Sequence, residues 1–315
     1  MKSLKGFKSF YLSLLAAALV FRSLSGVEAL IANEPVSSLL SKHADNIASL
    51  KKTCEKKVGL PAMKGLPYSN DVFFLRYCLA APEDTSAQTN RLRKNLDWRM
   101  KDGRSICAAA TSAIREAMAE GAWNNEPVLK SAPNSDVISK YIKPSNVITT
   151  TSSKNDLVYC IRAGSIEDAS LMEEVTVDQM VDFFLYAKEV NAQIANIRSE
   201  LTDELKCVIT ANDLTGVKLV GGSADFRKAL SQSSNIATEL YPATAGPTLL
   251  LNLPGLLSAL AKLFTPLFSK EVKDRLKFQQ GPLKDVSDLQ QVATSASGAE
   301  RTTFVKQLDE IIYAG

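Results

Sequence analysis

Residues 248–268 read TLLLNLPGLLSALAKLFTPLF and contain a single charge, at Lys262. A membrane-spanning helix needs about 20 apolar residues, so length and composition alone would allow one here. Asn252, Pro254 and Pro266 divide the run into pieces that are too short to span. Because proline cannot continue a strand ladder, the sequence predicts a short strand that ends near Pro254, followed by an apolar helix.

Three roles are open for the helix after Pro254: a core helix, a surface helix that contacts a membrane, or a lid over an apolar cavity. Apolar and β-branched runs alternate with helical patterns on both sides of it, which is typical of an α/β sheet. The expected strands and helices of this region are, in order, 207–211, 223–240, 248–253, 256–268 and 276–278.

The rest of the chain predicts helices and one β-hairpin. Thr85 with Gln88, and Thr176 with Gln179, have the spacing of capping boxes that open helices. Gly121 ends a third, alanine-rich pattern. Two β-branched runs separated by a polar turn predict the hairpin. The corresponding ranges are 72–81, 85–100, 105–120 and 177–185 for helices, 147–151 and 157–163 for the hairpin, and 301–312 for an amphipathic tail.

The N-terminus has the order of a secretory signal peptide. Lys2, Lys5 and Lys8 precede an uncharged run, 9–21, which is too short to span a bilayer, and a small residue, Ala29, offers a cleavage site. An uncleaved anchor is the alternative. Residues 1–29 hold four basic residues and one acidic residue, which accounts for the whole net charge of +3. The remaining neutral chain does not favour nucleic-acid binding or docking on membranes by bulk electrostatics.

Cysteine and histidine limit the chemistry further. The five cysteines form no C-x-x-C pair, and two lie in strand-like runs, so we expect buried thiols in the core. The single His43 excludes sites built from several histidines. Thiols are unusual in an oxidising compartment. A two-step address into a plastid is therefore an alternative to the secretory pathway, with residues 30–66 as a linker or transit-like segment.

Short motifs occur in a fixed order over residues 68–290. They are Asn70-Asp71, Leu75-Arg76-Tyr77, Trp98-Arg99, Arg162-Ala163-Gly164, Asp213-Leu214-Thr215-Gly216, Tyr241-Pro242, Asn252-Leu253-Pro254 and Phe264-Thr265-Pro266. As a set they resemble the CRAL-TRIO lipid-binding domain family, including its fungal phosphatidylinositol/phosphatidylcholine transfer proteins.

The resemblance implies an α/β fold with an N-terminal helical bundle and a mixed, largely parallel sheet flanked by helices, with a lidded apolar pocket. It gives the lid role to the helix after Pro254, with Leu256, Leu257, Leu260, Leu263 and Phe264 as lid and pocket residues. The expected divisions are 1–29 signal peptide, 30–66 linker or transit-like segment, 67–125 helical module, 140–290 lipid-binding domain and 291–315 amphipathic tail.

The resemblance also suggests head-group residues. In the fungal branch a Glu and a Lys bind the inositol phosphate. The matching positions here are Ala243 and Arg275. The cation is therefore kept, but the carboxylate that contributes to inositol selectivity is missing. Tyr159 and Thr210 match contacts to choline, whereas Val208 replaces a third. We expect a phosphatidylcholine-like phospholipid. Phosphatidylinositol and a hydrophobic small molecule such as a tocopherol or retinoid are the alternatives.

The expected function is lipid binding and transfer with transient membrane contact and no nucleic-acid partner. A lipid-sensing or scaffolding module that does not transfer its ligand is the second hypothesis. An enzyme is not expected, because no G-x-S-x-G occurs and Gly221-Gly222-Ser223 lacks the rest of a phosphate loop. We expect no metal and no cofactor other than the bound lipid.

Overall fold

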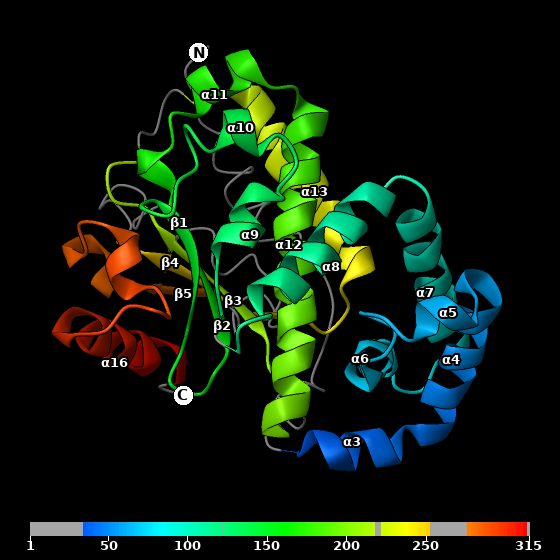
Figure 1. Ribbon diagram of the computed structural model, residues 1–315. Coiled ribbons are helices and arrows are strands. Elements are labelled where there is room, and N and C mark those ends of the chain that lie inside the picture. Colours follow the sequence, from blue (N-terminus) through cyan, green and yellow to red (C-terminus); the bar gives the residue numbers. More distant parts are fainter. Residues whose placement is uncertain (1–33, 122, 218–221, 253–275, 314–315) are drawn as a thin grey trace, which may run out of the picture.

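The computed structural model describes residues 34–121, 123–217, 222–252 and 276–313 (Figure 1). A helical region precedes a sheet flanked by further helices, as the sequence predicted. The helices before the sheet are α3 (Val36–Lys42), α4 (Ala44–Val58), α5 (Leu60–Met63), α6 (Asp71–Ala80), α7 (Thr85–Met100), α8 (Arg104–Ala117), α9 (Glu126–Lys130) and α10 (Ser135–Ile138).

The described strands form one five-stranded sheet in the order β1-β2-β3-β4-β5. β1 and β2 are the predicted hairpin and pair antiparallel, and the later neighbours pair in parallel. The mixed, largely parallel sheet is thus confirmed. The strands are β1 (Val147–Thr151), β2 (Leu157–Arg162), β3 (Val208–Asp213), β4 (Ala245–Leu251) and β5 (Leu276–Gln279).

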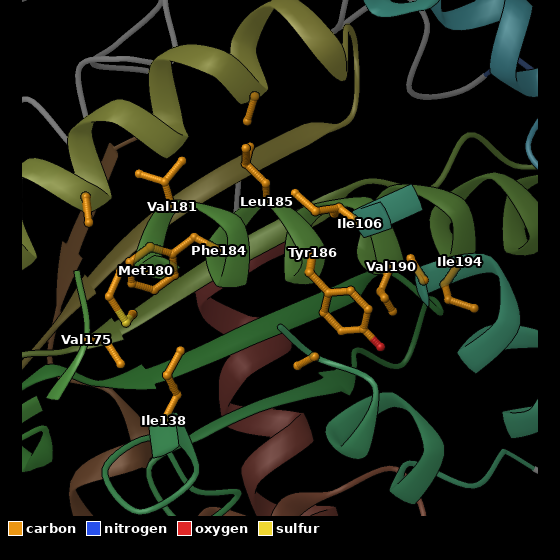
Figure 2. Packing of buried hydrophobic residues seen from close by; sticks show 14 of the residues in the cluster. Ile106, Ile138, Val175, Met180, Val181, Phe184, Leu185, Tyr186, Val190 and Ile194 are labelled. Carbon is orange, nitrogen blue, oxygen red and sulfur yellow. The ribbon is translucent and has the colours of Figure 1, made fainter. Parts of the chain in front are cut away.

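Helices cover both sides of the sheet. Figure 1 shows α16 on one side and α12 and α13 on the other. A hydrophobic cluster along α12 joins it to α8 and α13 (Figure 2). The elements after β2 are η1 (Ala163–Ser165), α11 (Asp168–Glu174), α12 (Val177–Thr202), α13 (Ala224–Leu240), η3 (Pro282–Asp285), η4 (Leu289–Val292) and α16 (Ala299–Tyr313).

One of the two predicted capping boxes is present. The Thr176 hydroxyl accepts from the Gln179 backbone N–H, and the Gln179 side chain accepts from the Thr176 backbone N–H, which opens α12. The prediction at Thr85 was wrong. Asp84 caps α7 by accepting from the backbone N–H of Ala87, while the Gln88 side chain donates to a carbonyl oxygen instead. A carboxylate one residue earlier satisfies the same helix terminus.

Residues 30–66 differ from the expected linker or transit-like segment, because α3, α4 and α5 lie within them. Leu39, Leu50 and Cys54 are buried in one cluster with α6 and α7. The buried face of α4 is a narrow stripe of Ile47, Leu50 and Cys54, and the residues between and after them include several lysines. A stripe this narrow is easily missed in the sequence. Removing this segment would expose the core of the helical region, which a transit peptide must not do.

Two arginines of the family-like motifs attach this helical region to the sheet domain. Arg76 donates to Asn196 Oδ1 of α12 at 2.5 Å, to the Lys206 carbonyl at 2.7 Å and to the carbonyl of Ala243. Arg99 forms a two-point ion pair with Glu189 of α12, at 2.9 and 2.7 Å. Both arginines are buried. Bidentate pairs of this kind fix orientation as well as distance, so the helices before the sheet are held in a defined position.

Within the described ranges, no helix combines the length and apolar composition that a membrane crossing requires. All five cysteines are present as thiols, and Cys54, Cys78 and Cys160 are buried, as expected from their apolar neighbours. The predicted signal peptide and the helix predicted after Pro254 lie outside the described residues.

Candidate functional site

The two faces of the sheet have different surroundings. Because successive side chains of a strand point to opposite faces, the strand register sorts them into two sets. The core face consists of Ile148, Thr150, Val158, Cys160, Ile209, Ala211, Leu249 and Leu251, all buried. The hydroxyl face consists of Val147, Thr149, Thr151, Leu157, Tyr159, Ile161, Val208, Thr210, Asn212, Thr248 and Leu250, most of them half-buried.

Four hydroxyl groups cross the hydroxyl face in one row. Thr149 is the register partner of Tyr159, Tyr159 of Thr210, and Thr210 of Thr248. Adjacent strands lie about 4.8 Å apart, so the structure places the two predicted head-group residues, Tyr159 and Thr210, side by side. Sequence reasoning missed Thr149 and Thr248, which only the cross-strand register brings into the row.

Only part of the hydroxyl face joins the described hydrophobic core: Leu157 belongs to the cluster along α12, and Val208 packs against that cluster. Tyr159, Ile161 and Leu250 belong to none of the three hydrophobic clusters found in the described part of the chain. The core face, by contrast, shares a cluster with Phe304 and Leu308 of α16 and with η3 and η4. The hydroxyl face therefore has the composition of a ligand-binding surface, with apolar side chains around a few polar groups.

Tyr159 is suited to donating a hydrogen bond. Burial raises the pKa of its phenol to about 12, so the hydroxyl is protonated at neutral pH. Helix α12 reaches the same face, because Thr149 Oγ1 donates to Asn191 Oδ1 at 3.2 Å. The side chains of the row itself are uncharged hydroxyl groups that can donate and accept hydrogen bonds. Among the described residues, no group of three or more His, Cys, Asp or Glu could hold a metal ion.

Several of the sequence motifs have a structural role next to the site. Asp213 Oδ1 accepts from the hydroxyl of Thr215 at 2.7 Å and from the amide of Asn252 at 3.0 Å. A side chain at Gly164 would approach the carbonyl oxygen of Thr215 to 2.4 Å, which only glycine avoids. The Asp-x-x-Gly and Arg-x-Gly motifs and the Asn of Asn-x-Pro thus hold together the loops at the carboxyl ends of β2, β3 and β4.

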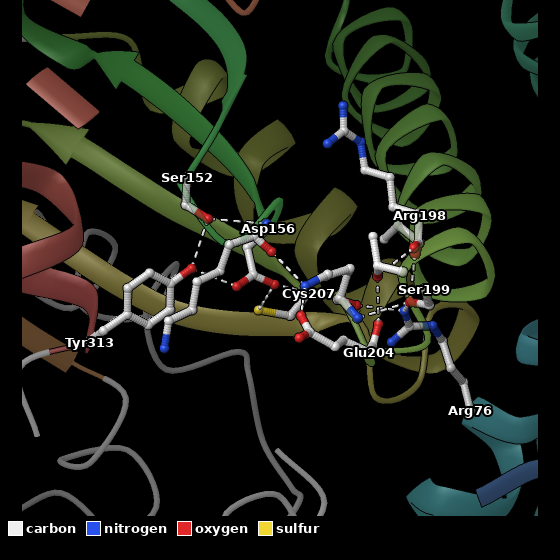
Figure 3. Close-up of polar contacts among 12 residues, drawn as sticks. Arg76, Ser152, Asp156, Arg198, Ser199, Glu204, Cys207 and Tyr313 are labelled. Carbon is white, nitrogen blue, oxygen red and sulfur yellow. Dashed lines mark hydrogen bonds and ion pairs between the residues drawn. The ribbon is translucent and has the colours of Figure 1, made fainter. Parts of the chain in front are cut away.

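A second polar network, which sequence reasoning missed, fixes the C-terminal helix to the hairpin. Tyr313 donates to Asp156 Oδ2 at 2.7 Å and lies 2.7 Å from the hydroxyl of Ser152 (Figure 3). The other carboxylate oxygen of Asp156 accepts from the backbone N–H of Cys207 at 3.0 Å. These contacts hold α16 against the sheet, at the opposite end of the strands from the Asp213 loops.

The remaining predicted site residues lie outside the described ranges. They are Arg275, Leu256, Leu257, Leu260, Leu263 and Phe264.

Comparison with known families assigns the sheet domain. The sequence model of the CRAL/TRIO domain matches residues 143–297, a range that includes all five described strands. The chain therefore carries a CRAL/TRIO domain. Members of this family bind lipids or hydrophobic small molecules.

Among solved structures, the chain is similar to one titled "Crystal structure of Sfh5", at 14% sequence identity and a TM-score of 0.46. The similarity covers 68% of this chain and 66% of that chain, slightly under two thirds of it. No curated protein sequence matches.

Proposed function

We propose that this protein is a lipid carrier that holds its ligand in an apolar pocket above the hydroxyl face, closed by a gate helix in residues 256–268. One observation carries the proposal: a largely half-buried face of the sheet, on which Tyr159, Ile161 and Leu250 join none of the described clusters, lies within the range that matches the CRAL/TRIO domain. No catalytic step is needed for this function.

Enclosure is a physical requirement for such a carrier. Two acyl chains with about thirty methylenes in total, at ~0.8 kcal/mol each, gain on the order of 20 kcal/mol on leaving water. An open groove would not retain them in solution. The apolar residues Leu256, Leu257, Leu260, Leu263 and Phe264 supply a surface that could close over the lipid in water and open at a membrane.

The ligand that fits best is a phospholipid of the phosphatidylcholine type. Tyr159 and Thr210 are neighbours in the hydroxyl row and are placed to donate to head-group oxygens. Ala243 does not provide the carboxylate that would read an inositol phosphate, and its carbonyl oxygen is already bonded to Arg76. Extraction of the protein from its own host, followed by mass spectrometry of the bound lipid, tests this. Recovery of phosphatidylinositol, a tocopherol or a retinoid as the main species would contradict it.

Transfer between labelled donor and acceptor vesicles tests the carrier function and the gate. Leu257→Asp should abolish transfer, because a carboxylate in an apolar gate surface cannot enter a membrane. Leu201→Asp is the matched control, since Leu201 is 76% exposed at the end of α12 and should tolerate the same change. Lipid loading with no transfer by the unaltered chain would favour a sensing or scaffolding module instead.

We further propose that residues 1–29 direct the chain into the secretory pathway, with a plastid reached by a two-step address as the alternative. The charge and length pattern of the segment supports the first step. Imaging a C-terminal fluorescent fusion in the native cell distinguishes the two destinations. A signal confined to the cytosol would contradict both.

A further inference from the structure

Lys188 lies on the side of α12 that faces the hydroxyl face and α13. Four residues before it, the Phe184 ring packs edge-on against Phe226 of α13, with centroids 5.7 Å apart. Three residues after it, Asn191 accepts the hydrogen bond from Thr149 of β1. Residues three and four apart share one helix face, so the Lys188 side chain leaves α12 between these two contacts.

Lys188 differs from the other buried cations in having no protein partner in the described part of the chain. The next residue, Glu189, is fully occupied by Arg99, and Gln193 donates to it as well. Arg76 donates hydrogen bonds to four oxygen atoms. No hydrogen bond or ion pair is made by Lys188 to any described residue. It is half-buried, and this burial lowers the pKa of its ammonium to about 8, so it is charged at neutral pH.

Helix spacing and strand register link the position of Lys188 to the hydroxyl row in two steps. Asn191 is one helical turn from Lys188, and it holds Thr149, the first residue of the row. Thr149 is in turn the register partner of Tyr159. A cation together with hydroxyl donors is the combination that binds phosphate oxygens, because charge-assisted hydrogen bonds are stronger than neutral ones. A quaternary ammonium placed against Lys188 would be repelled.

We propose that Lys188 binds the anionic phosphate of the carried lipid, with Tyr159 and Thr210 donating hydroxyl hydrogen bonds to the same head group. The assignment rests on the proposed carrier function and adds a selectivity: the site prefers lipids with a phosphate over neutral lipids with the same acyl chains.

The test uses the full chain and two probes with identical dioleoyl chains, phosphatidylcholine and diacylglycerol, presented together in vesicles. Lipid bound to the reisolated protein is measured by mass spectrometry. We expect Lys188→Met and Lys188→Gln to lower the ratio of phosphatidylcholine to diacylglycerol about tenfold or more. Lys188→Arg should retain it. Lys228→Met, at an exposed lysine of α13, is the matched control and should leave the ratio unchanged.

The ratio separates the two proposals. An unchanged ratio in both neutral variants overturns the role of Lys188 while the carrier function stands, and capture of neither lipid by the unaltered chain overturns the carrier function itself. Because only the ratio is read, a partial loss of folded protein does not imitate the expected result. Inorganic phosphate is the third probe. If it stabilises the unaltered chain but not Lys188→Met in thermal unfolding while the lipid ratio is unchanged in both neutral variants, Lys188 belongs to a site for free anions, and the lipid assignment is overturned.

Discussion

The two faces of the sheet are made by the same strands and have opposite surroundings. On β4, Leu249 belongs to the cluster shared with α16, whereas its neighbour Leu250 belongs to none of the described clusters. On β2, Cys160 is buried in that cluster and Tyr159 is half-buried beside a row of hydroxyls. The difference shows that stability and ligand binding are separated by the two-residue period of a strand, and adjacent residues can test that separation.

The largest effect is expected at β4. Leu249→Ala should lower the free energy of unfolding by about 2–5 kcal/mol, because it leaves a cavity in a closed core. Leu250→Ala should cost less than about 2 kcal/mol, since Leu250, although buried, joins none of the described clusters. Urea denaturation of both variants measures the difference. Equal losses would mean that the hydroxyl face is packed as tightly as the core face.

The second effect concerns how the charge of Lys188 changes the free energy of unfolding. Burial lowers its pKa from 10.5 to about 8, which corresponds to about 3 kcal/mol against the charged form. Between these two pH values the unfolded chain binds more protons than the folded chain, so stability rises with pH there. We expect Lys188→Met to be more stable than the unaltered chain at pH 7 and the advantage to shrink by pH 10. Denaturant unfolding at both pH values measures it, and an advantage independent of pH would contradict the assignment.

Two neighbouring threonines of β1 give a smaller contrast. Thr150 is fully buried on the core face and donates to the carbonyl of Val292 at 2.7 Å. The same hydroxyl accepts from the Arg301 guanidinium at 2.7 Å, so Thr150→Val removes both hydrogen bonds and should cost about 1–3 kcal/mol. Thr149→Val removes the longer bond to Asn191 and should cost about 1 kcal/mol or less. Thermal unfolding compares them, and a reversed order would contradict the division between faces.

The smallest stability effect is expected at Tyr159. Its hydroxyl has no hydrogen-bond partner among the described residues, so Tyr159→Phe should change stability by less than about 0.5 kcal/mol. Retention of phosphatidylcholine should nevertheless fall severalfold, because a head-group donor is lost. Cys160→Ala, on the opposite face, should show the inverse result, with lower stability and unchanged retention. Lipid retention after gel filtration checks both variants.

Local patterns in the sequence were enough for much of the fold. The hairpin, the capping box at Thr176 and the alternation of strands and helices follow from neighbouring residues, and the period of two already placed positions 208 and 210 on one face. Thr149 and Thr248 could not be assigned, because the row depends on strand register. Lys188 could not be assigned from the sequence either. Its burial without a described partner depends on α13 and the sheet, which are distant from it in the sequence.

The contacts of Arg76 and Arg99 with the sheet domain determine which segments of the chain can be transferred together to another protein. The segment that matches the CRAL/TRIO model, 143–297, contains Glu189 but not Arg99, and it stops before α16. Expressed alone, it would carry a buried carboxylate without its Arg99 cation and a core face that lacks α16. Recombination between relatives, in evolution or in the laboratory, must therefore exchange the helices before the sheet, the sheet domain and α16 together, as one cassette.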